Sequence, residues 1–226
     1  DDIDLTMMRP DYERLKEVAP QELPELYFFQ TAYTDGALFG IARLRNNATM
    51  AMLPNINYFN QGIFIDIDAL DDTSDGSPEE EEILAIQGEV WATVYNPQGV
   101  LEGIRQGATS YLSTKELLAL IELPQEERMR QFEAIAAERY GSSRMVNILV
   151  PAVCGWRQSY ERQWFKDLIE LPFESLWLPA PAAYDEVLSS SYGDYHQFVP
   201  GISAHENLLF SADISYTECL KEINFS

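Results

Sequence analysis

Aliphatic and acidic residues alternate in two short stretches, one at the start of the chain and one at residues 62–68. Side chains at positions i and i+2 of an extended strand leave the same face. Asp2 and Asp4 should therefore point the same way, and so should Asp66 and Asp68. We expect each strand to bury its aliphatic face and carry charge on the other. Two such strands side by side would gather three or four carboxylates.

Short apolar runs bounded by turn residues predict the other strands. These strands are expected at residues 26–34, 38–44, 146–150, 164–170 and 175–178. The first two flank Asp35-Gly36, a dipeptide typical of hairpin turns, and the last two are joined through residues 171–174 as a second hairpin. Asn46-Asn47 predicts a further turn ahead of the acidic strand.

Apolar residues at helical spacing predict the helices. They are expected at residues 10–19, 79–95, 115–122, 125–140 and 182–188. Pro10 suits the first turn of the first helix, and Pro20 should close that helix. Ser77 with Glu80 forms a capping-box pattern ahead of the second helix, and Gly193 should end the last one.

The remaining segments are interpreted as loops. Residues 71–78 are rich in Asp, Ser, Gly and Pro, Asn96-Pro97 interrupts the helical pattern, and the tail from residue 200 onwards is mixed. We find no internal repeat and no linker in the 226 residues. The sequence therefore predicts a single α/β domain with a small mixed sheet and a helical insert at about residues 78–141.

The composition favours a packed globular protein, since hydrophobic residues make up 46% of the chain and aromatic residues 12%. The net charge is −22, from 37 acidic and 15 basic residues. A surface this acidic repels nucleic acids and anionic membranes, so an anionic substrate would need a local basic patch or a metal ion. No apolar run has the length of a transmembrane helix, and no signal peptide is recognisable. Cys154 and Cys219 lack the spacing of a zinc site, and we expect two buried free thiols.

The acidic strands are the strongest candidate site. Carboxylates at close range repel one another, and Mg²⁺ or Mn²⁺ offsets this repulsion while taking its remaining ligands from substrate phosphates. An Asp-x-Asp pair alone would by default be an exposed strand end. Asp2 and Asp4 together with Asp66 favour a metal site, in which Asp68 is either a further ligand or the partner of a nearby arginine.

Two arginines could receive the phosphate groups. Arg43 and Arg45 share one strand face, and guanidinium groups suit the oxygens of a diphosphate. Pairing with the many acidic residues of the surface is the alternative. Asp71 and Asp72, by contrast, are interpreted as loop residues rather than as metal ligands.

The segment Tyr192-Gly193-Asp194 is a candidate substrate-binding turn, because Gly193 can end a helix with a positive φ and direct Asp194 towards a site. Aromatic residues could also enclose a quaternary ammonium group through cation–π contacts. The residues considered for such a cage are Tyr192, Tyr195, Trp156, Trp164 and Trp177. For any one of them, an ordinary place in the core or at its rim is the alternative.

Several of these segments resemble motif blocks of the LicD family. They follow one another along nearly the whole chain, at residues 1–5, 8–12, 42–49, 60–67, 171–186 and 192–195. The block Gly62-Ile63-Phe64-Ile65-Asp66-Ile67 and the pair of blocks around Tyr184-Asp185-Glu186 and Tyr192-Gly193-Asp194-Tyr195 are together the most specific. The family includes bacterial phosphocholine transferases and is related to fukutin-type phosphoribitol transferases.

The resemblance implies a nucleotidyltransferase-like fold in which Asp2, Asp4 and Asp66 hold a divalent metal. The implied reaction moves a phosphorylated alcohol, phosphocholine first among them, from a CDP-linked donor to a sugar hydroxyl of a cell-surface glycan. Asp66 would complete the metal site or take the proton of the attacking hydroxyl. The residues expected to bind substrate are Arg43, Arg45, Asp68, Tyr192, Gly193 and Asp194.

Some features depart from the family pattern. The family carries a Gly-containing turn ahead of the acidic pair, so we expect further sequence upstream of Asp1. The position of Asp68 is often apolar or aromatic in the family, and His196 stands where Met is common. Two alternatives remain: a nucleotidyltransferase or glycosyltransferase with the same acidic site, or a binding protein that has lost the chemistry. We expect a cytoplasmic location, or the Golgi lumen if an upstream segment carries an anchor.

Overall fold

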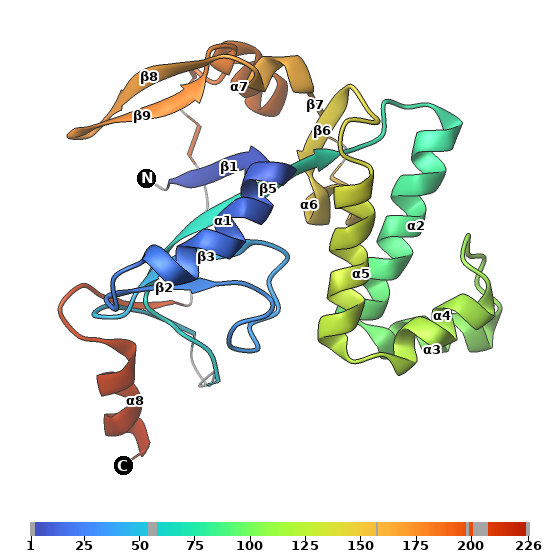
Figure 1. Ribbon diagram of the computed structural model, residues 1–226, viewed down its shortest axis with the longest axis horizontal. Coiled ribbons are helices and arrows are strands. Elements are labelled where there is room, and N and C mark those ends of the chain that lie inside the picture. Colours follow the sequence, from blue (N-terminus) through green and yellow to red (C-terminus); the bar gives the residue numbers. More distant parts are fainter. Residues whose placement is uncertain (1–2, 54–57, 157, 198, 201–207, 225–226) are drawn as a thin grey trace. The chain divides into compact units, whose positions relative to one another are not determined.

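The computed structural model describes the chain except for residues 1–2, 54–57, 157, 198, 201–207 and 225–226. It is a mixed α/β structure with antiparallel sheets, and the predicted fold class is confirmed at that level (Figure 1). The chain divides into two compact units. The first contains residues 1–69 and 201–226, and the second contains residues 70–200.

The described residues of the first unit form strands and helices. Its elements are β1 (Asp4–Met8), α1 (Arg9–Glu22), β2 (Tyr27–Gln30), β3 (Ala42–Asn46), β4 (Met50–Met52), β5 (Ile63–Asp72, which continues into the second unit), β10 (Leu209–Ser211) and α8 (Tyr216–Asn224). Strand β3 lies between β2 and β5, and β1 also pairs with β5. Strands β4 and β10 form a separate antiparallel pair.

The alternation in the sequence gives the main sheet of this unit two chemically different faces. Ile67 of β5, Ala42 of β3 and Tyr12 of α1 belong to one buried apolar cluster, and Figure 1 shows α1 alongside these strands. Asp66 and Asp68 of β5 leave the opposite face, because successive strand residues alternate. Burial of the apolar face fixes the charged face, since a slip of one residue would exchange the two.

The first helix is longer than predicted. Pro10 lies in its first turn as expected, but α1 continues through Pro20 and ends at Glu22. The N–H of Leu23 still bonds to the carbonyl of Ala19, so the last turn closes beyond the proline. A proline so close to the end of a helix removes a single backbone hydrogen bond, which is why it does not stop α1 where the sequence predicts.

The predicted hairpin around Asp35-Gly36 exists as the antiparallel pair of β2 and β3. Its strands are shorter than predicted, and residues 31–41 form a long connection in place of a tight turn. The Asp35 carboxylate accepts hydrogen bonds from Gln30 Nε2 at 2.8 Å and from the Asn60 N–H at 2.7 Å. Asp35 therefore ties the connection to the segment before β5.

The tail is more ordered than predicted. The sequence indicates mostly loop after residue 200, but β10 and α8 form there. Leu209, Phe210 and Ser211 of β10 pair with β4, a strand that the sequence also did not predict. Strands of three residues are too short to show periodicity, so only their pairing reveals them.

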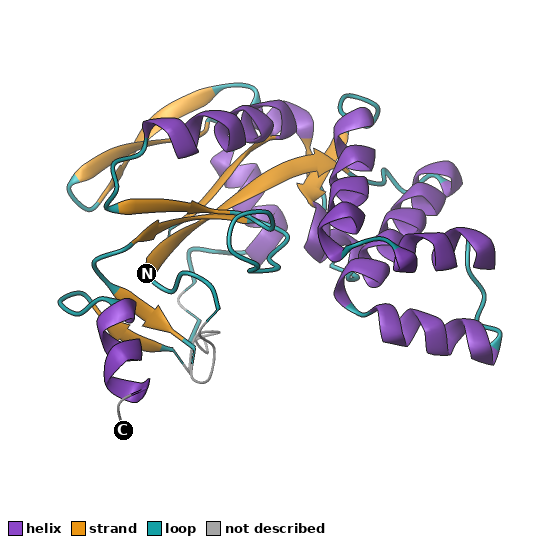
Figure 2. Ribbon diagram, turned by 60° about the horizontal axis from the view of Figure 1, so that its bottom comes forward, coloured by secondary structure: helices purple, strands orange, loops and turns teal. Residues whose placement is uncertain are grey.

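The second unit contains the predicted helical insert. Its helices are α2 (Pro78–Tyr95), α3 (Pro97–Gln106), α4 (Thr114–Glu122) and α5 (Gln125–Glu138), and Figure 2 shows this part as helices joined by loops. Ser77 caps α2, since its hydroxyl accepts the N–H of Glu80 at 3.4 Å. Only this half of the predicted capping box forms, because the Ser77 N–H donates to Asp75 Oδ1 and the Glu80 carboxylate binds Arg139. Asn96 does not end the helical structure, because its side chain accepts the N–H of Gly99 at 3.0 Å and starts α3 with Pro97 in the first turn.

The remaining elements of the second unit are β6 (Met145–Ile148), α6 (Leu149–Val153), β7 (Tyr160–Glu161), the 3-10 helix η1 (Arg162–Phe165), β8 (Leu168–Phe173), β9 (Leu176–Pro181) and α7 (Tyr184–Tyr192). Strand β6 pairs with the end of β5 and with β7. The predicted second hairpin is confirmed as β8 and β9, with Glu174 at a φ of 52° in its turn. Its first strand begins later than predicted, because Trp164 belongs to η1.

The interpretation of Asp71 and Asp72 as loop residues is wrong. Both belong to β5, pair with β6 and are buried. Asp72 accepts the N–H of Ser143 at 2.8 Å and forms an ion pair with Arg162. A buried carboxylate must be paired to be tolerated, and these two partners come from segments far along the chain.

Two predictions from the composition can be compared with the structure. None of the helices in the described ranges is both long and apolar enough to cross a lipid bilayer. Cys154 and Cys219 are free thiols, as predicted. The prediction that both are buried is wrong, since Cys154 is exposed and Cys219 is half-buried. The loop that follows α6 explains the exposure of Cys154.

Candidate active site

Three predicted carboxylates lie on two paired strands of the first unit. Asp66 and Asp68 leave the same face of β5, and Asp4 begins β1, which pairs with β5. The pKa of Asp68 is raised to about 7, first by burial and then by the negative charges of Asp66 and Asp4. The three carboxylates therefore share one electrostatic environment. Asp2, the remaining member of the predicted set, lies outside the described residues.

Asp66 is bound by an arginine of the neighbouring strand. Arg43 stands opposite Asp66 in the register of β3 with β5. Its Nε donates to Asp66 Oδ1 at 2.6 Å and its Nη2 donates to Oδ2 at 3.5 Å. The guanidinium carbon lies 3.9 Å from the ring centroid of Phe39 and 4.3 Å from that of Phe64, which fixes the plane of the group. The side chains of the ion pair are 15% and 20% exposed, so the pair lies near the surface.

Arg45 has a different environment from Arg43. It is 1% exposed, its Nε donates to Gln30 Oε1 at 2.5 Å, and its Nη1 donates to the carbonyl of Gly62 at 2.8 Å. Burial, followed by the positive charge of Arg43, lowers the pKa of Arg45 to about 10. These contacts link β2, β3 and the residues before β5. Arg43 is therefore the more accessible of the two predicted diphosphate ligands.

Gly62 is a positioning residue whose role is not evident from the motif block that contains it. A Cβ atom at this position would lie 2.1 Å from the carbonyl oxygen of Asn46, the last residue of β3. The Gly62 N–H also donates to Asn60 Oδ1 at 3.0 Å. Glycine thus allows β5 to start directly against the end of β3. That start sets the register in which Asp66 faces Arg43.

The predicted substrate-binding turn lies in the second unit. Tyr192 ends α7 with 74% of its surface exposed, and Gly193 follows with a φ of 67°, which confirms the predicted positive φ. Asp194 accepts a hydrogen bond from Gln197 Nε2 at 2.7 Å. The neighbouring Tyr195 hydroxyl donates to Asp185 at 2.7 Å. These contacts shape the end of α7, and the part of Tyr192, Gly193 and Asp194 in substrate binding stays a prediction.

The donor chemistry of the first unit fits a hard divalent cation. Asp4, Asp66 and Asp68 offer oxygen ligands. The raised pKa of Asp68 reflects burial first and then the negative charges of Asp66 and Asp4, which a cation would offset. Over the part of the chain that the structure describes, no three His, Cys, Asp or Glu side chains are arranged to hold a metal ion. The ligand type is therefore present, while Arg43 holds one of the carboxylates that Mg²⁺ or Mn²⁺ would use.

Comparisons with known proteins add no relative. No family model matches the chain. Neither a characterised protein nor a solved structure matches it. The resemblance to the LicD family therefore rests on the motif blocks of the sequence.

Proposed function

We propose that this protein transfers a phosphorylated alcohol from a CDP-linked donor to a sugar hydroxyl of a glycan. The observation that carries the proposal is the ion pair of Arg43 and Asp66 in the same environment as Asp4 and Asp68. Carboxylates that can hold a cation, together with a guanidinium that can bind phosphate, are the groups that a diphosphate substrate requires. The resemblance of the acidic blocks to the LicD family supports the same class of reaction.

Arg43 would bind the diphosphate of the donor. Its guanidinium already faces the two oxygens of the Asp66 carboxylate, and a phosphate presents two oxygens in a similar way. When Arg43 exchanges Asp66 for phosphate, the Asp66 carboxylate is released. Donor binding would thereby make Asp66 available as a metal ligand or as a proton acceptor.

Mg²⁺ or Mn²⁺, held by Asp2, Asp4 and Asp66, would supply positive charge against the diphosphate and the departing CMP. Asp66 and Asp68 are the two candidates to accept the proton of the attacking sugar hydroxyl. In the absence of metal, burial and then the charges of Asp66 and Asp4 raise the pKa of Asp68 to about 7. A bound cation would lower this pKa and favour the carboxylate, the form that accepts a proton. Asp66 has the advantage of greater exposure.

The experiment follows the phosphorus atom. CDP-choline labelled in the phosphate next to choline would be incubated with the protein, Mg²⁺ and a range of glycan acceptors, with CDP-ribitol and CDP-glycerol in parallel. We expect the label on the acceptor and release of CMP. A nucleotidyltransferase would instead place the cytidylyl phosphate on the acceptor, and a glycosyltransferase would require a nucleotide sugar.

A second candidate function is donor binding without transfer. The observation in its favour is that Arg43 neutralises Asp66, one of the carboxylates that a metal ion would use. The test uses protein saturated with Mg²⁺ or Mn²⁺ and supplied with acceptors. If this protein binds a CDP-alcohol saturably but releases no CMP, the result supports donor binding and contradicts transfer. Release of CMP that depends on both acceptor and Asp4 would contradict the binding protein.

A further inference from the structure

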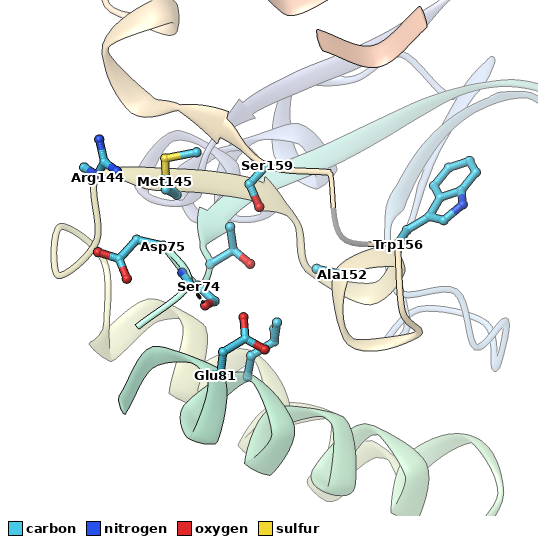
Figure 3. Close-up of a pocket in the computed structure, with 11 residues that line it drawn as sticks. Ser74, Asp75, Glu81, Arg144, Met145, Ala152, Trp156 and Ser159 are labelled. Carbon is cyan, nitrogen blue, oxygen red and sulfur yellow. Dashed lines mark hydrogen bonds between the residues drawn. The ribbon is translucent and has the colours of Figure 1, made fainter. Parts of the chain in front are cut away.

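A pocket in the second unit combines hydrogen-bonding side chains with an exposed indole. The cavity measures about 270 Å³ and is formed by the segment after β5, helix α2, strand β6 and the region from α6 to β7. The residues that line it are Thr73, Ser74, Asp75, Gly76, Glu81, Leu84, Arg144, Met145, Ala152, Trp156 and Ser159. Figure 3 shows their side chains around the cavity.

Both donors and acceptors converge on this pocket. In Figure 3, Glu81 rises from α2 towards Ser74, and the Ser159 hydroxyl points towards the same space from the opposite side. Asp75 and Arg144 lie at one end; hydrogen bonds from Ser77 chiefly, and the charge of Arg144 as well, lower the pKa of Asp75. Carboxylates accept, guanidinium groups donate and hydroxyls do both. This mixture matches a ligand with several hydroxyl groups, each of which donates and accepts.

Trp156 borders the other end of the pocket and is 76% exposed. Its backbone is fixed on both sides, because its N–H bonds to the carbonyl of Pro151 at 2.9 Å and its carbonyl accepts from Asn147 Nδ2 at 3.3 Å. The indole ring is largely apolar, so its exposure to water is unfavourable. Exposed tryptophans on a fixed backbone are typical of ligand-binding surfaces. Its flat apolar face can cover the C–H face of a sugar ring.

We propose that this pocket binds a single ring of a neutral sugar. Among the lining residues that the structure describes, the carboxylates of Glu81 and Asp75 outnumber the guanidinium of Arg144, which disfavours an anion. A quaternary ammonium group makes no hydrogen bonds and would leave the converging donors and acceptors without partners. The volume of about 270 Å³ is just below the roughly 300–1,000 Å³ typical of small-molecule pockets, which suits one ring. The inference does not depend on the proposed transfer, because no donor and no metal take part.

The test measures binding alone. The full chain, with neither metal nor CDP donor, would be titrated with methyl glycosides of glucose, galactose, mannose and N-acetylglucosamine and with choline, and ligand signals would be followed by NMR. We expect saturable binding of at least one glycoside. Glu81→Gln and Trp156→Ala should each weaken it about tenfold, in line with the loss of roughly one good contact. The matched controls are Glu79→Gln on the same helix and Trp177→Ala on β9, neither of which lines the pocket.

Three results would overturn the proposal: no binding of any glycoside, equal binding by the parent and both pocket variants, or saturable binding of choline alone. Thermal melts would show that each variant is folded. If one variant does not fold, Ser159→Ala would take its place. The assay contains no donor, so an absence of sugar binding would not contradict the proposed transfer reaction. Likewise, an absence of transfer activity would not contradict sugar binding in this pocket.

Discussion

The guanidinium of Arg43 lies 2.6 Å from one oxygen of Asp66 and 3.5 Å from the other. This ion pair joins β3 and β5 on the charged face of the sheet, one residue from the end of their pairing. Asp68, two residues along β5, lies beyond the pairing with β3, which runs from Asn46 opposite Ile63 to Ala42 opposite Ile67. Asp66 is therefore bound by an arginine, whereas the raised pKa of Asp68, about 7, lets it bind a proton near neutral pH.

Arg45→Ala should mainly lower stability, whereas Arg43→Ala should mainly weaken donor binding. Arg45→Ala removes a buried cation and leaves Gln30 and the carbonyl of Gly62 without their donor, so it should lower the free energy of unfolding by about 3–5 kcal/mol. Arg43→Ala, near the surface, should cost about 1–3 kcal/mol and mainly weaken donor binding. Chemical denaturation and calorimetric titration with CDP-choline measure the two effects. Equal stability losses would contradict the difference in burial.

Asp68→Asn should change how stability depends on pH. The carboxyl has a pKa near 3.9 when unfolded and about 7 when folded, so between these values the folded state binds a proton that the unfolded state lacks. The contribution of Asp68 is therefore fully present below about pH 4 and is lost as pH rises through about 7. Between pH 4 and pH 8, the free energy of unfolding of the metal-free parent should fall by on the order of a few kcal/mol relative to that of Asp68→Asn. Chemical denaturation of the parent and of Asp68→Asn across that pH range measures this loss. If the difference in their free energies of unfolding does not change with pH, the pKa of Asp68 is not raised by folding.

Metal binding should stabilise the protein through Asp4. Mg²⁺ or Mn²⁺ that binds only the folded state raises the melting temperature, and Asp4→Asn should abolish that rise without unfolding the chain. Asp11→Asn is the matched control, because Asp11 is an acid in the first turn of α1 and belongs to no predicted ligand set. A shift that survives Asp4→Asn would place the metal elsewhere.

Gly62→Ala should be strongly destabilising although it adds a single methyl group. Its Cβ would lie 2.1 Å from the backbone oxygen of Asn46, so β5 would have to move away from β3 at a cost of about 3 kcal/mol or more. Gly88→Ala in α2 is the control, since its Cβ would meet Val153 at an ordinary distance of 3.6 Å. There alanine should stabilise the helix by about 0.5–1 kcal/mol. Two equal effects in denaturation would contradict the close approach at Gly62.

Local sequence chemistry determined the features that depend on neighbours along the chain. The alternation around Asp66 and Asp68 predicted which face of β5 carries charge, and the fixed period of two in a strand is the reason. Ser77 predicted the start of α2 because a cap requires only residues within one turn. Asn96-Pro97 was ambiguous, since the same dipeptide can break one helix and begin the next, and it does both here.

Only the tertiary structure decided what depends on partners distant in sequence. Arg43 and Arg45 look equivalent in the sequence, but packing buries Arg45 against Gln30 and Gly62 and leaves Arg43 on Asp66. Asp72 can lie buried in β5 because Arg162 and the N–H of Ser143 bind its carboxylate. Burial and Coulomb interactions depend on distance in space, and the folded chain sets those distances through strand pairings that periodicity does not reveal.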